Sequence, residues 1–394
     1  MTKEKKRSSA LTGVILSVVL LALVVFLENS GLVPPTHILF TVLKKGAVYS
    51  LVAVSMNLLN GFTGLFSLGQ AGFMLLGAYT YAILTVPTNV RDSVYYLYGG
   101  SAIHFSLQEL FGSIFGNSGV GGAVSLVLGV LLGLILAGCV AALFAYLIGL
   151  PVLRLKSDYL AIATLGFAEI IRAVFQWQKL GPITNGANLI KSFPTFSSFN
   201  IKSGGKVVLY LSTFVPFFVA ILCIAVIVLL INSTYGRAFK AIRDDEVAAE
   251  AMGIDLAHHK MLSFCISSFF AGVGGALFAM FSNNAQAMPY TSAMTYEILL
   301  IVVIGGIGSI SGSIIGPFLY VASAEWWLRG LDNGQFLFIK APGVFRSGFR
   351  MVVFSVIIMI VVLFFRKGIM GDQELPQKLR GLRARLGKKK EAAK

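Results

Sequence analysis

Charged side chains are scarce in this chain. Only 12% of its 394 residues are Asp, Glu, Lys or Arg, whereas soluble domains usually contain about 25%. Five long runs contain none at all: 46–90, 122–153, 207–236, 261–296 and 351–365. Uncharged apolar runs of this length are typical of membrane-spanning helices and exclude a soluble globule, and none shows the ten-residue alternation of a membrane barrel. The sequence therefore predicts an all-α, polytopic integral membrane protein.

Cysteine and histidine are also few, with three and four residues. Cys139, Cys223 and Cys265 each lie alone in an apolar run, which fits small packing residues rather than a disulfide framework. His258 and His259 are adjacent, so on a helix they point about 100° apart, and no further ligand pattern accompanies them. We expect no metal site.

A phosphate-binding loop is missing as well. No G-x-x-x-x-G-K-[ST] pattern occurs, and the glycine-rich stretches lie between apolar runs, where glycine serves close helix packing. We therefore expect no ATPase site and no cofactor bound by this chain, and we do not expect it to be an enzyme.

The net charge of +15 fits a membrane protein better than a nucleic-acid-binding one, because the basic residues gather at the chain ends. The start "MTKEKKRSS" and the apolar run after it resemble a signal peptide. That run continues to Leu27 and meets no small-residue cleavage pattern, so we expect a retained first span.

Dividing the apolar runs into segments of the length of a membrane-spanning helix gives ten predicted spans. The run 297–328 is too long for one helix and is broken by "GGIGSISGS" at 305–313, so it is divided in two. The predicted spans are 11–27, 38–59, 69–86, 123–149, 159–177, 207–231, 261–281, 293–307, 311–328 and 350–366.

Orientation follows from the lysines and arginines. Most of the 32 lie on the cytoplasmic side if both termini are cytoplasmic. Residues 178–206, with four lysines and no acid, argue against this, but the two tails dominate. We predict a cytoplasmic basic N-terminus over 1–10, a transmembrane domain over 11–366 with a cytoplasmic loop at 232–260, and a cytoplasmic basic tail over 367–394.

That loop contains the densest acidic stretch of the chain, "AIRDDEVAAEAMGID" at 241–255, which holds five of the 17 carboxylates. Carboxylates contribute little to topology. Acidic residues followed by alanines and then Gly253 predict a short helix at the membrane surface that ends at the glycine. On charge alone, a solvated loop helix is the favoured interpretation.

Four lines of sequence resemble the branched-chain amino acid permeases of the LivM type. They are "LNGFTGLFSLGQAGFMLLGAY" (59–79), "GLPVLRLKSDYLAIATLGFAEIIR" (149–172), "YGRAFKAIRDDEVAAEAMGIDLAHHK" (235–260) and "VIGGIGSISGSIIGP" (303–317). The second and third are specific, while the first and fourth also occur in related sugar and nucleoside permeases. The resemblance covers about residues 46 to 366.

This resemblance implies the permease subunit of an ATP-binding-cassette importer in the cytoplasmic membrane of a prokaryote. The implied partners are two ATPase subunits that use ATP, a second similar permease subunit, an extracytoplasmic solute-binding protein, a branched-chain or similar apolar amino acid, and membrane lipid, with no nucleic acid. The acidic stretch would dock on an ATPase subunit, with Ala249 and Met252 as its apolar face. The implied coupling residues are Arg237, Arg243, Asp244, Asp245, Glu246, Ala249, Glu250 and Gly253.

Three departures from the family pattern leave the transport class intact and the substrate open. Gln70 stands where the family often has His, "TNGANLI" at 184–190 lacks a Gly pair, and residues 88–121 form an enlarged outer loop.

Two glycine interruptions, 61–72 and 305–316, are candidates for the translocation path, because transporter sites favour interrupted helices. The plainer alternative is that they are packing contacts and turns. Glu169 and Arg172, at i and i+3, predict an intramembrane pair that is either structural or moves with gating. The candidate path residues are Asn57, Ser67, Gln70, Thr164, Glu169, Arg172, Ser309 and Ser311.

Other functions stay open at this point. The same kind of importer for urea, short amides, a sugar or a nucleoside fits nearly as well. A secondary carrier would place acidic residues within spans, where only Glu169 and Glu297 qualify, and a scaffold would not need paired glycine interruptions.

Overall fold

The structure is a computed structural model that describes residues 3–328, except 32, 117–118, 156 and 204–205, together with short pieces between 335 and 374. The described residues form helices and two small two-stranded antiparallel sheets, which confirms the predicted all-α class.

The elements have these bounds. The helices are α1 (Lys3–Asn29), α2 (Ile38–Asn57), α3 (Gln70–Thr85), α4 (Thr88–Val94), α5 (Leu107–Phe115), α6 (Gly119–Val152), α7 (Ser157–Gln176), α8 (Gly181–Thr184), α9 (Phe214–Ile231), α10 (Thr234–Asp244), α11 (Glu246–Ala251), α12 (Leu256–Ser282), α13 (Ser292–Gly305) and α14 (Ile310–Val321). Two π-helical segments, η1 (Leu58–Thr63) and η5 (Ala322–Trp327), continue α2 and α14. The short 3-10 turns are η2 (Tyr96–Tyr98), η3 (Gln178–Leu180) and η4 (Phe196–Phe199), and the paired strands are β1 (Ile201–Ser203) with β2 (Lys206–Leu209) and β3 (Gln335–Phe336) with β4 (Ile339–Lys340).

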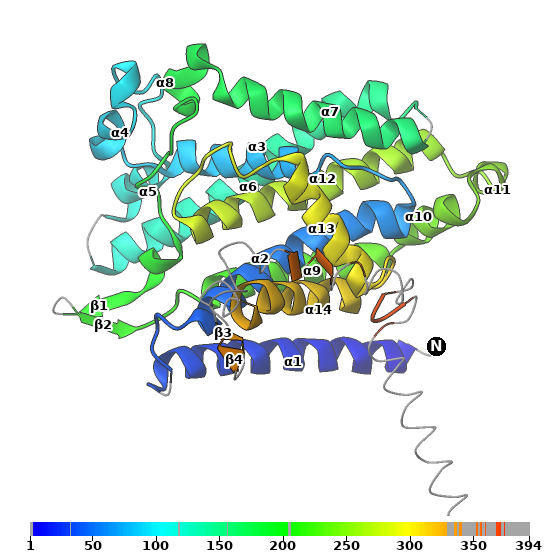
Figure 1. Ribbon diagram of the computed structural model, residues 1–394, viewed down its shortest axis with the longest axis horizontal. Coiled ribbons are helices and arrows are strands. Elements are labelled where there is room, and N and C mark those ends of the chain that lie inside the picture. The colour runs from blue at the N-terminus through cyan, green and yellow to red at the C-terminus, as the bar shows by residue number, and fades with distance from the viewer. Residues whose placement is uncertain are drawn as a thin grey trace, which may run out of the picture.

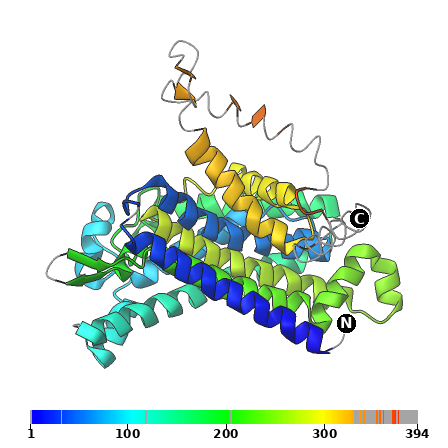
Figure 2. The same ribbon diagram turned by 90° about the horizontal axis from the view of Figure 1, so that it is seen from below.

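The long helices form a bundle around α12, which packs against α2, α3 and α6 (Figure 1). In Figure 1, α7 lies above α12 and α1 lies below it, and Figure 2 shows α13 and α14 on the side of the bundle away from α1. Helices α4, α5 and α8 and the β1–β2 hairpin gather at one end, called here the α4 end. Helices α10 and α11 lie at the opposite end, the α11 end, where α1 also begins.

Glycines set the tight spacing between α3 and α12. A Cβ atom on Gly77 would overlap the carbonyl of Gly272, and one on Gly275 would overlap the carbonyl of Met74. Because lipid tails are as apolar as the helices, close van der Waals packing rather than hydrophobic exclusion holds such helices together. The core of the bundle therefore depends on small residues at these crossings.

The predicted count of ten spans is not confirmed. Among the described residues, five helices are long and apolar enough to cross a membrane, and a sixth span results when α13 and α14 count as one. The chain breaks where the sequence predicted, but α13 and the α14–η5 helix meet at 119°, as in a broken span or a re-entrant loop. The 14 residues of α13 extend about 21 Å, less than the hydrocarbon core of about 30 Å. The predicted span 350–366 lies almost wholly outside the described residues.

The predicted span 207–231 starts too early. Residues up to Leu209 belong to β2, and α9 begins only at Phe214. The buried Glu28 of α1 fixes this start, because its carboxylate accepts hydrogen bonds from Ser212 Oγ (2.6 Å) and from the backbone N–H of Thr213 (3.1 Å). Hydropathy alone could not separate the apolar strand from the helix that follows.

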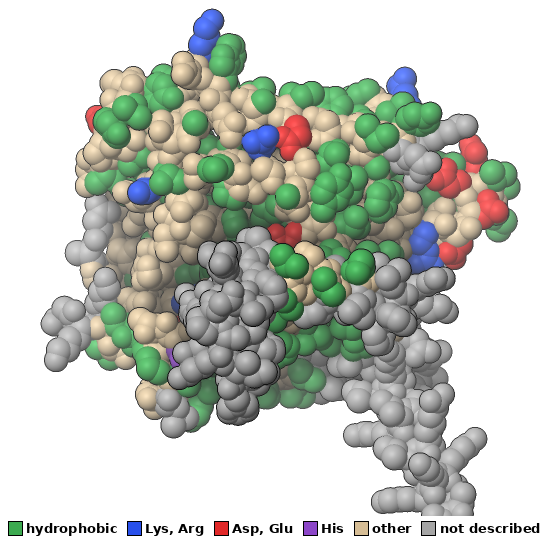
Figure 3. Space-filling model, in the orientation of Figure 1, with side chains coloured by type: hydrophobic (Ala, Val, Ile, Leu, Met, Phe, Trp, Pro, Cys, Tyr) green, Lys and Arg blue, Asp and Glu red, His purple; other side chains and the backbone are tan. Residues whose placement is uncertain are grey.

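Large apolar side chains remain exposed along several long helices. Leu16 on α1, Leu143 on α6 and Ile162 on α7 are each more than half exposed, and Figure 3 shows hydrophobic side chains over much of one face. A monomeric soluble protein rarely exposes such patches, whereas a lipid-facing surface requires them. The chain is a multi-pass membrane protein.

Candidate functional site

The acidic stretch of the sequence forms two helices, α10 and α11, joined at Asp245. Gly236, Phe239 and Ile242 of α10 are buried against the bundle. Asp245 has an extended backbone, and its side chain accepts from the backbone N–H groups of Val247 (2.9 Å) and Ala248 (3.0 Å). This N-cap satisfies two amide groups that the helix itself cannot. The predicted start signal is confirmed, although it opens the second of two helices.

Gly253 ends α11 in a left-handed conformation, with φ +83°. Its N–H donates to the carbonyl of Glu250 (2.9 Å), and the N–H of Ile254 donates to that of Ala249 (3.1 Å). The predicted glycine stop is confirmed. A Cβ here would meet nothing within 4 Å, so a substitution strains the backbone rather than clashing.

Most of the carboxylates in this stretch act within the chain. Asp244 pairs with Arg243 (2.8 Å), and Glu246 pairs with Lys260 of α12 (2.6 Å). Asp255 caps α12 by accepting from the backbone N–H of His258 (3.0 Å). The local density of acidic residues is thus largely explained by helix caps and ion pairs.

Part of the exposed surface of α11 and of its C-cap residue is a small mixed patch. Val247 is 78% exposed and Met252 83% exposed, and Glu250 is exposed with no ion-pair partner among the described residues. These three residues are called here the coupling face. The prediction that Ala249 belongs to the apolar face is wrong: it is 4% exposed, because it lies on the side of α11 turned toward the bundle. Figure 3 shows acidic side chains gathering at this end of the molecule, and Arg237 of α10 is exposed there.

The first glycine interruption is a break between η1 and α3. Residues 64–69 are neither helix nor strand. Hydrogen bonds from other helices hold the break: Thr164 of α7 accepts from Leu68 N (3.0 Å), and Thr295 of α13 accepts from Ala71 N (3.2 Å). Gln70 donates to Ser55 of α2 (2.7 Å). Three predicted path residues, Ser67, Gln70 and Thr164, therefore lie around this break, and all three are buried.

The second interruption, between α13 and α14, contacts the first through Asn57. The Asn57 Oδ1 atom accepts from Gly308 N (2.8 Å), and Nδ2 donates to the Ser309 carbonyl (3.0 Å) and to Ser313 Oγ (2.8 Å). A Cβ on Gly61 would lie 2.6 Å from Gly308 N. The two breaks are distant in sequence but touch in the fold, and Asn57 joins them.

The two predicted serines of the second interruption make structural contacts. Ser309 caps α14 by accepting from Gly312 N (3.2 Å). Ser311 Oγ donates to Glu374, whose carboxylate also accepts from the backbone N–H groups of Ile310 (2.8 Å) and Ser311 (3.0 Å). Their place on a translocation path stays a prediction.

Arg243 connects α10 and α11, together called here the coupling segment, to both breaks. Its Nη1 donates to the carbonyl of Gly61 (3.2 Å). A Cβ on Gly64 would lie 2.9 Å from Arg243 Cγ, and one on Gly308 would lie 3.5 Å from Arg243 Nη1. A displacement of α10 would therefore bear directly on the interrupted helices.

Glu169 and Arg172 form the predicted pair on α7, with 2.7 Å between Glu169 Oε2 and Arg172 Nη2. The same carboxylate accepts from Ser292 Oγ (2.6 Å) and Ser292 N (3.1 Å) at the start of α13. Glu169 thus joins α7 to the start of the short helix α13.

This geometry predicts a measurable interaction energy. Glu169→Gln and Arg172→Gln should each lower thermal stability, and the double variant should lose less than the sum. We expect a coupling energy on the order of 0.5–1 kcal/mol, because both side chains are about a third exposed. Unfolding of the purified variants measures it. Ser292→Ala should couple to Glu169→Gln as a second arm, and strict additivity in both cycles would contradict the contact.

Sequence reasoning missed the hydroxyl partners of the breaks. Ser55, Thr295 and Ser313 lie in predicted spans, are buried, and bind Gln70, the backbone of Ala71 and Asn57. The one signal in the sequence that could have identified these partners was a serine or threonine hydroxyl inside an uncharged run. Which run would lie beside which interruption could be known only from the fold.

Among the described residues, no three His, Cys, Asp or Glu side chains come together as a metal ion would need. Cys139 is exposed, Cys223 is buried and Cys265 is intermediate, and all three are free thiols.

Comparison with known proteins shows what this chain is similar to. The family described as "Branched-chain amino acid transport system / permease component" matches residues 38–365. The high-affinity branched-chain amino acid transport system permease protein LivM of Escherichia coli is 33% identical over 301 residues, or 71% of this chain and 61% of LivM. The probable LivM of Methanocaldococcus jannaschii is 25% identical, over 70% of this chain and 76% of its own.

A sugar permease is also similar. The L-arabinose transport system permease protein AraH of Escherichia coli is 29% identical over 154 residues, or 38% of this chain and 44% of its own. No solved structure matches. The matched region spans 61% of the length of the Escherichia coli and Salmonella typhimurium LivM proteins.

Proposed function

We propose, since the chain belongs to the family of permease components of branched-chain amino acid transport systems, that it is the membrane subunit of an ATP-driven importer. Its solute would be a branched-chain or similar apolar amino acid, carried across the cytoplasmic membrane of a prokaryote. The observation that carries the proposal is the coupling segment: α11 and its C-cap residue expose Val247, Glu250 and Met252 at one end of the bundle, and Arg243 of the preceding α10 contacts the broken helices.

The mechanism rests on the rigidity of that segment. Asp245 and Gly253 fix both ends of α11, so an ATPase subunit that holds the coupling face moves the segment as a unit. Arg243 passes the movement to Gly61, and Asn57 passes it to the second break. The short helix α13, the α14–η5 helix and the break before α3 can change their relative angles without opening a continuous helix. This would switch access to the solute from one side of the membrane to the other.

The proposed partners follow from the coupling segment, the α4 end and the exposed surface of α7. Two ATPase subunits would hydrolyse ATP, and this chain would bind no cofactor of its own. A solute-binding protein would deliver the amino acid at the α4 end. A second, similar permease subunit would cover α7, because only 28% of that span is buried and its Glu169–Arg172 pair is partly exposed. Charged side chains within a membrane normally face protein or water rather than lipid.

We place the α11 end in the cytoplasm. The start of α1 lies at that end, and the basic residues of the N-terminus favour the cytoplasmic side. A total of ten spans, with the basic tail also cytoplasmic, remains our proposal for the whole chain.

Reconstitution tests the function. The chain, the second permease and two ATPase subunits are placed in liposomes with the binding protein, and uptake of radioactive leucine is followed with and without ATP. Uptake that requires both ATP and the ATPase subunits supports the proposal. Uptake without ATP would identify a secondary carrier, and no uptake of any solute would fit a scaffold.

A sugar is the second candidate solute, because the arabinose permease AraH is similar over 38% of this chain. Competition separates the two. Excess unlabelled leucine or isoleucine should abolish uptake of labelled leucine, whereas arabinose and urea should leave it unchanged.

A further inference from the structure

Glu297 is a carboxylate of the short helix α13 that takes no part in the coupling segment or in the contacts that hold the two helix breaks. It lies eight residues before Gly305, which is about 12 Å along the helix from the second break. Helix α13 packs there against α2 and α14 (Figure 1). Carboxylates within membrane spans are rare and normally mark a functional site, so Glu297 requires a partner.

Charged and phenolic side chains from three elements gather around Glu297. Its carboxylate lies beside the hydroxyl of Tyr320 on α14, and the charged groups that act on it within the described part of the chain are Lys45 of α2 and Glu325 of η5. Lys45 forms an ion pair with Glu325, and its ammonium lies 5.4 Å from the centre of the Tyr49 ring. These five residues are called here the Glu297 cluster.

The Glu297 cluster contains two carboxylates and one cation. That cation, Lys45, already pairs with Glu325, and Glu297 forms no ion pair of its own with any residue that the structure describes. A carboxylate without a counter-charge is costly in low-dielectric surroundings, so the cluster favours a cation from outside the chain. Glu297 is partly exposed, and the side chains of Lys45 and Glu325 are 19% and 28% exposed, so the cluster remains accessible.

Tyr49 supplies a second polar group that the chain does not use. The residue is 3% exposed, and Glu297 and Glu325 are among the titratable groups around its hydroxyl. That hydroxyl forms no hydrogen bond among the described residues, yet it is not one of their fully enclosed polar atoms, so it keeps accessible surface. Native proteins rarely leave a buried hydroxyl without a partner, and a phenol can donate. Tyr49 therefore offers a donor to a ligand held at Glu297.

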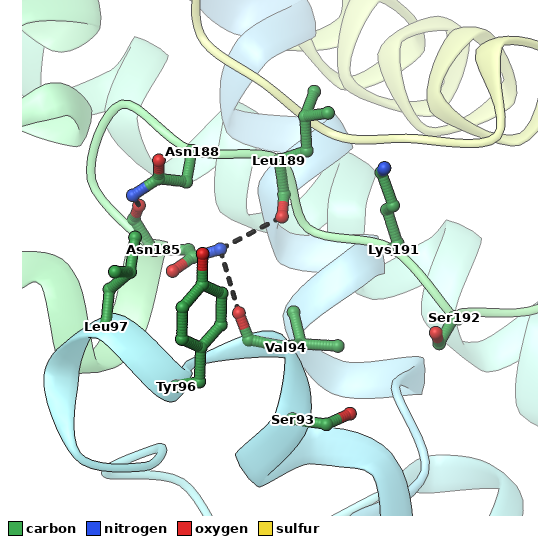
Figure 4. A pocket seen from close by; sticks show the side chains of 9 residues that line it. All are labelled: Ser93, Val94, Tyr96, Leu97, Asn185, Asn188, Leu189, Lys191 and Ser192. Atoms are coloured by element: carbon green, nitrogen blue, oxygen red, sulfur yellow. Dashed lines mark hydrogen bonds between the residues drawn. The ribbon is translucent and has the colours of Figure 1, made fainter.

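The cavity at the α4 end lacks this combination. It measures about 340 Å³ and lies between the end of α4 and the segment that follows α8 (Figure 4). Its described lining includes Lys191 but no carboxylate. An ammonium group would find no counter-charge in that cavity, whereas Glu297 provides one.

We propose that the Glu297 cluster binds the charged head of an apolar α-amino acid inside the bundle, with the ammonium group at the Glu297 carboxylate and the ligand's carboxylate accepting a hydrogen bond from Tyr49. The inference rests on the proposed import of such amino acids and adds a residue that selects them. A sugar or urea has no ammonium group and would gain nothing from Glu297. Because Glu297 lies on α13 and Tyr49 on α2, a change in the angle of α13 would also separate the two groups and release the solute.

The test is direct binding to the complete importer in nanodiscs, without the binding protein, measured by calorimetry. Three probes are compared: leucine, 3-methylbutan-1-amine, which lacks the carboxylate, and 4-methylpentanoate, which lacks the ammonium group. In the unaltered importer, leucine should bind about tenfold or more tightly than 4-methylpentanoate, as expected for one charged hydrogen bond. This comparison needs no variant, so it decides the proposal even if a substitution prevents assembly.

Two substitutions separate the two ends of the ligand. Glu297→Gln should weaken leucine and 3-methylbutan-1-amine by the same factor, about tenfold, and should not weaken 4-methylpentanoate. Tyr49→Phe should weaken leucine and leave 3-methylbutan-1-amine unchanged, because only leucine has the carboxylate that Tyr49 binds. Glu297→Asp, which keeps the charge on a shorter side chain, should retain part of the preference for leucine over 4-methylpentanoate.

The matched control is Glu109→Gln. Glu109 of α5 accepts hydrogen bonds from Thr88 at the α4 end and lies outside the Glu297 cluster, so all three affinities should stay unchanged. Equal losses for all three probes in Glu297→Gln would show a purely structural role and overturn the site. Equal affinity for leucine and 4-methylpentanoate in the unaltered importer, or no binding of leucine up to millimolar concentration, would do the same. ATP-driven leucine uptake by the same unaltered importer shows whether the proposed function stands when the site fails.

Discussion

Arg243→Gln is expected to lower ATP-driven uptake by about tenfold or more while the ATPase subunits stay bound. The side chain lies between the coupling segment and the helix breaks, where its Nη1 donates to the Gly61 carbonyl (3.2 Å). Glutamine is too short and lacks the charge to keep this bond together with the pair to Asp244. Hydrogen bonds to charged groups contribute about 1.5–3 kcal/mol, and the lower end applies here because the side chain is 39% exposed.

The measurement is leucine uptake in proteoliposomes, together with ATP hydrolysis and the amount of ATPase subunit that co-purifies. ATP hydrolysis should continue in Arg243→Gln, because the ATPase subunits still dock and only the transmission of their movement to the helix breaks is lost. Arg243→Lys keeps the positive charge but lacks the planar guanidinium group, so its leucine uptake should lie between that of the unaltered protein and that of Arg243→Gln.

Arg237→Gln is the matched control, since Arg237 is an exposed arginine of the same helix and has no hydrogen bond or ion pair to a break among the described residues. Because the family resemblance implies a docking role for Arg237, any loss of uptake in this variant should be matched by an equal loss of co-purifying ATPase subunits. If Arg243→Gln instead loses the ATPase subunits in proportion to uptake, Arg243 is a docking residue and the proposed link to the breaks is wrong.

The second large effect is expected on α11, at Glu250 of the coupling face and at Gly253, which ends the helix. Gly253→Val and Glu250→Lys should express and insert normally, yet abolish uptake and solute-stimulated ATP hydrolysis. Valine at φ +83° is strained by at least 1–2 kcal/mol. A helix of six residues whose last turn depends on that glycine would fray. Glu250→Lys reverses the charge of the one carboxylate that the structure shows exposed and unpaired on α11, which should weaken docking by about 1–3 kcal/mol if the contact is desolvated.

Co-purification of the ATPase subunits should fall in parallel with uptake in both variants. Gly253→Asn is the matched control for the first, because asparagine tolerates the left-handed region and should retain most activity. Glu250→Gln should be milder than Glu250→Lys. Wild-type ATPase binding and uptake in both Gly253→Val and Glu250→Lys would mean that the segment is only a solvated loop, and the proposed function would lose its main support.

The sequence by itself determined the class of the protein and the local signals. Charge-free runs longer than 18 residues leave no soluble alternative. The two ends of α11 were readable because Asp245 and Gly253 act on their own neighbours, through a side-chain cap and a left-handed turn. The Glu169–Arg172 pair was readable for the same reason, since three residues along a helix make a contact.

The tertiary structure alone decided which of these local features work together. The sequence predicts that Ala249 lies on a helix but not which side of that helix is buried. Only the packing of α11 against the bundle shows that Ala249 faces inward. The start of α9 depends on Glu28, about 185 residues earlier in the chain. Asn57 meets Gly308 across 251 positions, and Arg243 meets Gly61 across 182. Hydropathy and helix signals act over a few residues, whereas these contacts arise when helices cross, so the link from the coupling face to the broken helices exists only in the folded bundle.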